Sequence, residues 1–211
     1  MEPTVTQPAD TLPTLPHTSG GALDGWLRTS ALFAEFEKRR EIPSDMQDHL
    51  LDLFTWGRGW PFAHILELGV RTGNSTSAFL AALETDRRGT LWSVDIAEPD
   101  VPPEWHKSPF WSFLKADALT AEAMNWAPPE LDVLFLDTDP HSFYQTMAEL
   151  QAYAPRVRKG GVILVHDTDH PDAAEPALAL REYQRIAHTS EREIDLRFKR
   201  GCHGLGIMRI R

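Results

Sequence analysis

The chain has 211 residues, of which 42% are hydrophobic and 25% are charged, and its formal net charge is −10. A chain of this length commonly forms one globular domain, and the acidic balance argues against a nucleic-acid partner, because binding to a phosphate backbone needs clustered Lys and Arg. No apolar run approaches the ~20 residues of a transmembrane helix, and the single cysteine, Cys202, excludes an internal disulfide and fits a reducing compartment. We therefore predict a cytoplasmic protein without a membrane or nucleic-acid partner.

The N-terminal region is expected to contain a tail and two helices. Residues 1–21 are rich in Pro, Thr and Gly and show no periodicity, which predicts a flexible tail before a single domain over 22–211. Two helices within 22–60 are expected to cap the core, and they could also pair two copies of the chain, although nothing in the pattern requires a homodimer. The first has apolar positions from Leu23 at helical spacing, namely Leu27, Ala31 and Ala34. The second begins with Ser44 and Gln47 in capping-box register and has the expected buried stripe Met46, Leu50, Leu53 and Phe54.

Short apolar runs alternate with helical stretches over 64–211, which is typical of βαβ units and a mostly parallel sheet. The predicted strands are Ile65–Leu68, Thr90–Asp95, Trp111–Lys115, Leu131–Asp137, Gly161–His166, Glu193–Lys199 and Leu205–Ile210. The last two have no room between them for a crossover helix, so they must form an antiparallel hairpin. Helices are expected between the other strands, most clearly over His141–Ala154. The predicted fold is a doubly wound, Rossmann-like α/β fold with a seven-stranded sheet and a C-terminal antiparallel hairpin.

A glycine-containing turn follows the first predicted strand. The segment Glu67-Leu68-Gly69-Val70-Arg71-Thr72-Gly73-Asn74-Ser75 leads from an apolar strand through two glycines into a helix, and glycines let a ligand approach the backbone closely. The alternative is a tight turn that needs glycine for its own geometry. Asp95 ends the second strand, where a carboxylate can accept hydrogen bonds from both hydroxyls of a ribose. The turn and the acid together predict an adenosine-type ligand.

The spacing of this turn, E-x-G-x-x-x-G, differs from the G-x-G-x-x-G of nicotinamide enzymes. It resembles the first motif of class I methyltransferases, which use S-adenosylmethionine, and the resemblance extends from about His64 to the C-terminus. This resemblance implies that Glu67 lies beneath the amino group of the donor, that Asp95 holds its ribose, and that Asp117 receives the adenine amino group. A helix cap is the alternative for Asp117. The implied donor-binding set is Glu67, Gly69, Thr72, Gly73, Asn74, Ser75, Asp95, Ile96, Asp117 and Ala118.

Acids and imidazoles follow the fourth and fifth predicted strands. The stretches are Leu136-Asp137-Thr138-Asp139-Pro140-His141 and Val165-His166-Asp167-Thr168-Asp169-His170. Both lie where parallel strands end, the edge at which open α/β sheets bind ligands. Carboxylates gathered there suit Mg²⁺, and several His would admit a transition metal. The alternative is that these acids cap helices and lie in solvated loops.

This second half resembles a narrower group of small-molecule O-methyltransferases, which act on sugars, macrolides and similar natural products. The phrase Gly160-Gly161-Val162-Ile163-Leu164-Val165-His166-Asp167-Thr168 carries that resemblance. It implies that Asp137 and Asp167 bind Mg²⁺ or another divalent cation, with Asp169 as the third ligand. The chain departs from the group in having His166 before Asp167, and in carrying one extra residue ahead of His141.

The predicted function is O-methylation of a small-molecule hydroxyl, with Asp137 and His141 as catalytic residues. An alcohol must lose its proton to attack, and the unperturbed pKa of an imidazole, about 6.5, suits His141 as general base; the alternative is that His141 faces water. Arg71 and His203 are further candidates for the cleft, although the sequence offers no physical reason to prefer that over solvent. Two other functions stay open: a metal-dependent oxygenase or hydroxylase that uses the His/Asp cluster, and a non-catalytic module that binds S-adenosylmethionine.

Overall fold

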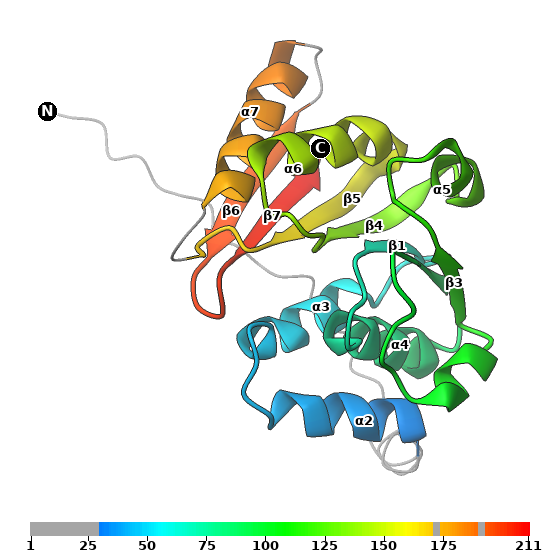
Figure 1. Ribbon diagram of the computed structural model, residues 1–211. Coiled ribbons are helices and arrows are strands. Elements are labelled where there is room, and N and C mark those ends of the chain that lie inside the picture. The colour runs from blue at the N-terminus through cyan, green and yellow to red at the C-terminus, as the bar shows by residue number, and fades with distance from the viewer. Residues whose placement is uncertain (1–29, 171–173, 190–192) are drawn as a thin grey trace, which may run out of the picture.

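The computed structural model describes residues 30–170, 174–189 and 193–211, so the predicted tail over 1–21 lies outside the described residues. Within these ranges seven strands form one sheet in the order β3-β2-β1-β4-β5-β7-β6 (Figure 1). The strands are β1 (His64–Leu68), β2 (Thr90–Asp95), β3 (Trp111–Lys115), β4 (Leu131–Leu136), β5 (Val157–His166), β6 (Ile194–Lys199) and β7 (Leu205–Ile210). The first five pair in parallel, and β7 pairs antiparallel with both β5 and β6. The predicted fold class is therefore confirmed.

Only one strand differs substantially from its predicted bounds. β5 begins at Val157 instead of Gly161, because the two glycines at 160 and 161 lie inside the strand and do not form a turn before it. The pairing of β4 with β5 shifts register between Leu131 and Val133, which accommodates this irregular stretch. Gly160 has a φ of +85° and open space around its Cα, so a glycine is accommodated there without breaking the ladder.

Helices cover both faces of the sheet (Figure 1). They are α2 (Ala31–Arg40), α3 (Leu50–Trp56) and α4 (Asn74–Asp86) on one face and α5 (Ala121–Trp126), α6 (Phe143–Tyr153) and α7 (Glu175–Thr189) on the other, with 3-10 turns η1 (Gln47–His49), η2 (Pro103–Lys107) and η3 (Ala154–Arg156). Alternate residues of β4 supply the two cores: Val133 and Phe135 pack on the α4 side, Leu134 and Leu136 on the α6 side. Among the described residues no helix has the length and apolar content to cross a bilayer.

The first predicted helix buries a different face from the expected one. In α2 the side chains of Ala31 and Ala34 are exposed, whereas Phe36 is buried and stacks on Phe54 of α3 with ring centroids 5.0 Å apart. The predicted stripe is therefore wrong at Ala31 and Ala34, because a large aromatic ring buries more apolar area than a methyl group and sets the orientation of the helix. Leu27 lies outside the described residues.

The second predicted helix has the expected buried face but a different start. Ser44 accepts a hydrogen bond from the Met46 amide at 3.3 Å, and the side chain of Gln47 donates to the carbonyl of Arg40 at 2.8 Å. The predicted reciprocal capping box therefore does not form, and η1 leads into α3 instead. The stripe itself is confirmed: the buried members are Met46, Leu50 and Leu53, with Phe54 partly buried.

Candidate active site

The carboxyl ends of the parallel strands border one cleft of about 820 Å³. It spans the point between β1 and β4 at which the strand order reverses, which is where open α/β sheets bind ligands. The predicted site residues in its lining are Gly69, Asp95, Ile96, Asp117, Ala118, Asp137, His141 and Asp167. The structure thus brings expected donor-binding residues and expected catalytic residues into one cavity.

Gly69 is required by the close approach of two strands. Its φ is +90°, and a Cβ atom at this position would lie 2.1 Å from the carbonyl oxygen of Asp137. The Asp137 amide donates to the carbonyl of Leu68, and the Gly69 amide donates to the carbonyl of Val94, each at 2.9 Å. The turn after β1 is therefore locked between the ends of β4 and β2, and it presents bare backbone to the cleft.

Asp95 shapes this turn as well as lining the cleft. Its Oδ2 atom accepts hydrogen bonds from the amides of Val70 and Arg71 at 2.8 and 3.0 Å, and its Oδ1 atom accepts one from Ala97 at 2.9 Å. Both lone pairs of Oδ2 are therefore engaged, and Oδ1 keeps one lone pair for a ligand hydroxyl. The next residue, Ile96, is 71% exposed at the cleft, although a large apolar side chain gains nothing from contact with water.

Two residues after β3 continue the cleft. Asp117 is exposed, and its Oδ1 atom accepts a hydrogen bond from the Leu119 amide at 2.8 Å, which closes a turn before α5. Ala118 is buried, and its carbonyl accepts a hydrogen bond from the Tyr153 hydroxyl. The N-cap of α5 is Thr120 and not Asp117, so the cap alternative is wrong; Asp117 lines the cleft, and its contact with an adenine amino group stays a prediction.

Glu67 lies beneath the cleft in the interior. It is fully buried and accepts hydrogen bonds from the hydroxyls of Ser75, Thr76 and Ser93 at 2.6, 2.9 and 2.6 Å. Burial outweighs these hydrogen bonds and, with the negative charge of Asp137, raises the pKa of Glu67 to about 7. The carboxyl group fastens the first turn of α4 to β1 and β2.

Five of the predicted donor-binding residues do not line the cleft: Glu67, described above, and Thr72, Gly73, Asn74 and Ser75, whose contacts hold the N-terminus of α4 in place. Ser75 is buried against Glu67, and Arg39 of α2 donates to the Thr72 carbonyl at 2.7 Å and to Asn74 Oδ1 at 3.0 Å. Gly73 has a φ of +76°, and a Cβ atom there would lie 2.8 Å from the ring of Trp105 in η2. The glycine at 73 is thus explained by packing.

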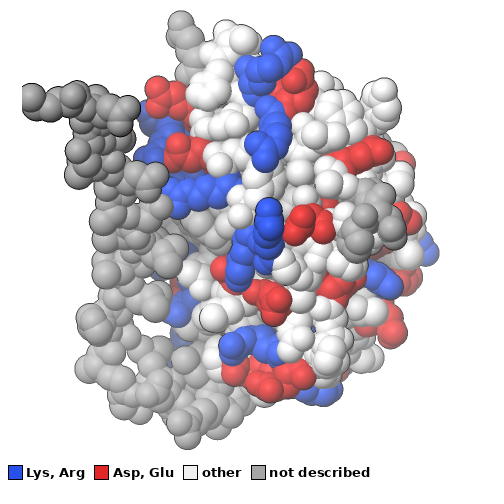
Figure 2. Space-filling view, turned by 90° about the vertical axis from the view of Figure 1, so that its left-hand side faces the viewer, with Lys and Arg blue, Asp and Glu red and all other residues white. Residues whose placement is uncertain are grey.

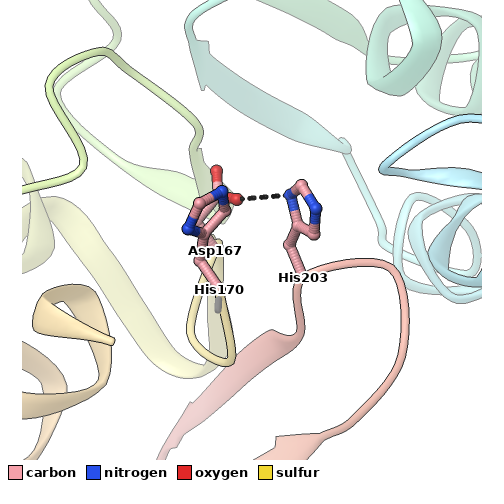
Figure 3. A group of neighbouring side chains, drawn as sticks. All are labelled: Asp167, His170 and His203. Atoms are coloured by element: carbon pink, nitrogen blue, oxygen red, sulfur yellow. Dashed lines mark hydrogen bonds and ion pairs between the residues drawn. The ribbon is translucent and has the colours of Figure 1, made fainter. Parts of the chain in front are cut away.

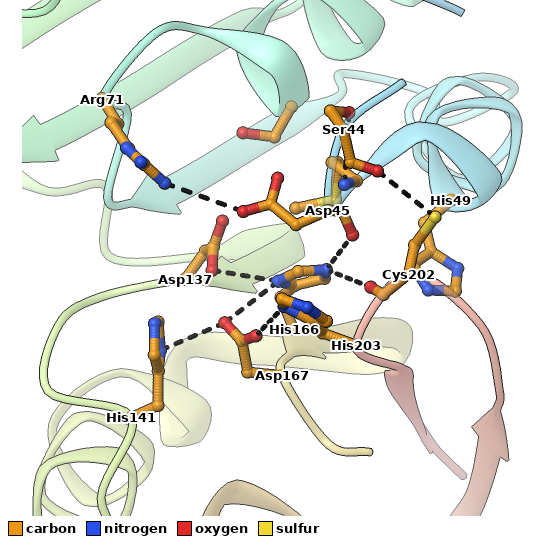
Figure 4. A network of polar contacts seen from close by, with 12 residues as sticks. Ser44, Asp45, His49, Arg71, Asp137, His141, His166, Asp167, Cys202 and His203 are labelled. Carbon is orange, nitrogen blue, oxygen red and sulfur yellow. Dashed lines mark hydrogen bonds and ion pairs between the residues drawn. The ribbon is translucent and has the colours of Figure 1, made fainter. Parts of the chain in front are cut away.

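A polar cluster occupies the other end of the cleft, where β4 and β5 end (Figure 4). The imidazole of His166 is buried, with Nδ1 lying 3.2 Å from Asp137 Oδ1 and 3.1 Å from Asp167 Oδ2. Its Nε2 atom faces the backbone carbonyls of Asp45 and Cys202 at 3.0 and 2.9 Å. Burial opposes a charge on this ring, but the hydrogen bonds and negative charges of the two aspartates outweigh it and raise the pKa of His166 to about 11.

Asp167 is surrounded by imidazoles. Besides His166, the Nδ1 atoms of His141 and His203 each lie 3.2 Å from its carboxylate. Burial acts to raise the pKa of Asp167, but the hydrogen bond and charge of His166, with the charges of His141 and His203, lower it to about 2. His141 lies in the loop before α6, whose N-cap is Ser142, so the helix begins two residues later than predicted. Asp167 therefore orients His141 through Nδ1.

The third predicted metal ligand is not part of this cluster. Asp169 is exposed, does not line the cleft and offers its backbone amide to the His203 carbonyl at 2.7 Å. Among the residues that the structure describes, two groups of side chains have donor atoms within 4.8 Å of one another: Asp137, His166 and Asp167 in one, and Asp167, His170 and His203 in the other. The prediction therefore placed Asp137 and Asp167 correctly beside each other and expected imidazoles at the same edge, but it did not assign His166 as a ligand.

Arg71 and His203 do line the cleft, as does Asp45, which the sequence did not suggest. Asp45 lies in the loop before η1, and its carboxylate is 3.6 Å from the guanidinium of Arg71. A loop of the N-terminal region therefore reaches across the cleft to the turn after β1.

A Rossmann-like sheet with this cleft at its switch point defines a nucleotide-binding α/β enzyme fold. Residues 66–168, from within β1 to just after β5, match a family model described as a methyltransferase domain. No curated protein matches the chain. The segment contains the glycine turn, Asp95, Asp117 and the ends of β4 and β5, so the predicted methyltransferase with S-adenosylmethionine as donor is confirmed, and an oxygenase or a non-catalytic module is not favoured.

Solved structures share the class I methyltransferase fold at low sequence identity. A protein of Corynebacterium glutamicum is 18% identical, with a TM-score of 0.57 over 92% of this chain and 91% of that one. MycE methyltransferase from the mycinamycin biosynthetic pathway, solved with Mg and SAH, is 19% identical, with a TM-score of 0.60 over 83% of this chain and 53% of MycE. CalS11, a TDP-rhamnose 3'-O-methyltransferase of calicheamicin biosynthesis, is 18% identical, with a TM-score of 0.58 over 85% of this chain and 95% of CalS11. This chain thus spans about half the length of MycE.

Proposed function

We propose that the protein transfers a methyl group from S-adenosylmethionine to a hydroxyl oxygen of a small molecule. The observation that carries the proposal is that one cleft joins the Gly69 turn and Asp95 to His141, Asp137 and Asp167. The donor supplies an electrophilic methyl group on a sulfonium, and transfer is an in-line displacement that depends on alignment. The chain therefore needs a donor pocket on one side of the transferred methyl group and, on the other side in the same cavity, an acceptor hydroxyl with a proton acceptor beside it.

His141 is the proposed proton acceptor. Asp167 holds its Nδ1 atom at 3.2 Å, which leaves Nε2 as the ring nitrogen not bonded to that carboxylate. Its side chain is 34% exposed at the cleft, so an acceptor can approach it. As the acceptor oxygen bonds to the methyl carbon, the carbon–sulfur bond breaks, S-adenosylhomocysteine leaves, and the hydroxyl proton passes to Nε2. The negative charge of Asp167 stabilises the imidazolium that forms.

Asp137, Asp167 and His166 would hold the divalent cation of this proposal. Two carboxylate oxygens and one ring nitrogen converge, and Nε2 of His166 is fixed by backbone carbonyls in the way that orients metal-binding imidazoles. The Nδ1 proton must leave before this atom can bind a cation. A bound cation would lower the pKa of the acceptor hydroxyl.

Charge supports a small-molecule acceptor over a nucleic acid. The formal net charge is −10, and the cleft lining contains many more carboxylates than guanidinium groups, with Arg71 as its single Arg or Lys among the described residues. On the face seen in Figure 2, basic side chains lie among acidic ones and do not form a patch. MycE has also been solved with mycinamycin VI, which supports a natural-product alcohol as acceptor. A cytoplasmic location and a homodimer stay predictions.

Calorimetric titration with S-adenosylmethionine tests the donor pocket. Ile96→Ala is expected to weaken donor binding roughly 5- to 30-fold, because about 1 to 2 kcal/mol of apolar contact with the adenosine is lost. Its melting temperature should not change, since Ile96 is 71% exposed and has no role in the core. The matched control is Leu178→Ala, because Leu178 is 58% exposed on α7 and does not line the cleft.

Equal affinity in wild type and Ile96→Ala would contradict the pocket, and absence of donor binding in the wild type would overturn the proposed function. The acceptor class is tested by release of S-adenosylhomocysteine with sugar and macrolide alcohols, compared with matched amines in which nitrogen replaces the hydroxyl. Turnover with amines alone would contradict O-methylation.

A further inference from the structure

Three side chains from two loops converge at the edge of the cleft (Figure 3). Asp167 and His170 lie in the segment that follows β5, and His203 lies in the turn between β6 and β7. One donor atom from each lies within 4.8 Å of the others, and His203 Nδ1 is 3.2 Å from Asp167 Oδ1. We infer that Asp167, His170 and His203 form a binding site for a divalent transition-metal ion.

The donor set determines the class of ion. It comprises two imidazole nitrogens and one carboxylate oxygen, a combination that suits first-row transition metals and leaves coordination positions open. Mg²⁺ prefers oxygen donors and retains several waters, so it has little to gain from two ring nitrogens. The ion expected here is Mn²⁺, Fe²⁺, Co²⁺ or Zn²⁺.

The backbone holds these donors in place. The Asp169 amide donates to the His203 carbonyl at 2.7 Å, so the segment after β5 is bonded to the hairpin turn. Gly204 packs against the same segment so closely that a Cβ atom there would lie 2.6 Å from the Asp169 amide nitrogen. Since the two loops cannot separate without breaking these contacts, His203 stays beside Asp167, as a preorganised ligand set requires.

The site differs from the group formed by Asp137, His166 and Asp167, although both include Asp167. The two carboxylate oxygens of Asp167 point to different partners: Oδ1 faces His203, and Oδ2 faces His166 and His141. A single carboxylate can therefore serve both groups, one through each oxygen. Substitution of a residue that belongs to one group alone, such as Asp137 or His203, therefore distinguishes ion binding at one site from ion binding at the other.

An ion at this site would border the space assigned to the acceptor. His170, His203 and His141 all line the same cleft, and the side chain of His203 is 37% exposed. The open positions of a site with three protein ligands would face this space. The inference does not depend on methyl transfer, because it rests on the donor atoms alone.

The test is titration of the full-length, untagged protein, freed of metal by a chelator, with Co²⁺, followed by ligand-field absorption. Calorimetry with Zn²⁺ and with Mg²⁺ complements it. His203→Ala and His170→Ala should each lower the Co²⁺ affinity more than about 100-fold, because even changes to residues behind the ligands cost 10- to 100-fold. His188→Ala, which removes an exposed imidazole on α7, is the control and should bind Co²⁺ as the wild type does.

We expect Asp137→Asn to retain Co²⁺ binding and Mg²⁺ to compete weakly. Absence of Co²⁺ absorption in the wild type would overturn the inference, and so would loss of binding in Asp137→Asn but not in His203→Ala. Titration of His203→Ala and His170→Ala with S-adenosylmethionine shows whether each is folded. A wild type that binds Co²⁺ through His203 but not S-adenosylmethionine would refute the proposed function and leave the metal site standing.

Discussion

Burial of Glu67 makes the stability of the protein depend on pH in a way that can be calculated. The carboxyl group is fully buried, and burial, outweighing the hydrogen bonds from three hydroxyls, raises its pKa from 4.5 to about 7. The folded protein keeps this proton up to near-neutral pH, whereas the unfolded chain loses it near pH 4.5. Between these values the folded state binds more protons, so the free energy of unfolding falls as pH rises. The difference between the two pKa values corresponds to roughly 3 kcal/mol.

Glu67→Gln removes this ionisation and keeps a side chain that can bond to the same hydroxyls. Relative to wild type, the variant should gain roughly 2 to 3 kcal/mol of unfolding free energy between about pH 5 and about pH 8, measured by urea denaturation. Glu130→Gln, which neutralises an exposed carboxylate, should give a profile parallel to that of the wild type. A Glu67→Gln profile that also runs parallel to the wild type would refute the reasoning, because the buried group would then have an ordinary pKa.

Two further substitutions test the catalytic and backbone arguments. His141→Gln should lower kcat by roughly 100- to 10,000-fold with an unchanged Kd for S-adenosylmethionine, since a general base acts only on the acceptor; an unchanged kcat would exclude His141 as the base. Gly69→Ala should lower the free energy of unfolding by at least about 3 kcal/mol, because the added Cβ meets the Asp137 carbonyl. Gly160→Ala is the control, since Gly160 has a similar φ but open space around it, and it should lower the free energy of unfolding by about 1 kcal/mol. Thermal or urea unfolding measures both. Equal costs at the two glycines would contradict the close approach.

The strands could be predicted because their apolar residues leave a direct trace in the sequence. β4 is buried at all six positions and reads as a continuous apolar run broken only by Asp132, which accepts hydrogen bonds from the His64 amide and the Arg158 side chain. The buried face of the first N-terminal helix was harder to predict, because a helix with apolar residues on several sides does not reveal which side faces the core. In α2 the choice is made by contact with α3 and α4, through Phe36, and no spacing rule contains that contact.

The donor-binding end of the cleft was more predictable than the end that holds the aspartates and imidazoles. Gly69 follows β1 and Asp95 ends β2. Because these two strands are parallel neighbours, their carboxyl ends lie side by side, and the sequence therefore predicts that the two residues are close together. Gly73 shows the limit of the same reasoning, because its positive φ and its lack of a side chain serve packing on Trp105. A glycine after a strand can thus mark a close approach, as Gly69 and Gly73 do, but the sequence does not say whether a ligand or another part of the chain approaches, and Gly160 lies in open space.

The sequence predicted imidazoles at this edge of the sheet but not how His166 is held, because its decisive contacts involve the backbone of distant segments. His166 Nε2 is fixed by the carbonyls of Asp45 and Cys202, which are 121 and 36 residues away in sequence. Every residue type has a carbonyl, so neither contact leaves a mark in composition or spacing. The same ring faces Asp137 and Asp167 through Nδ1, and it therefore ties the loop before η1 and the β6–β7 turn to the catalytic end of the cleft. A shift of the backbone in either loop would therefore act on the position of His166 and, through Asp167, on the orientation of His141.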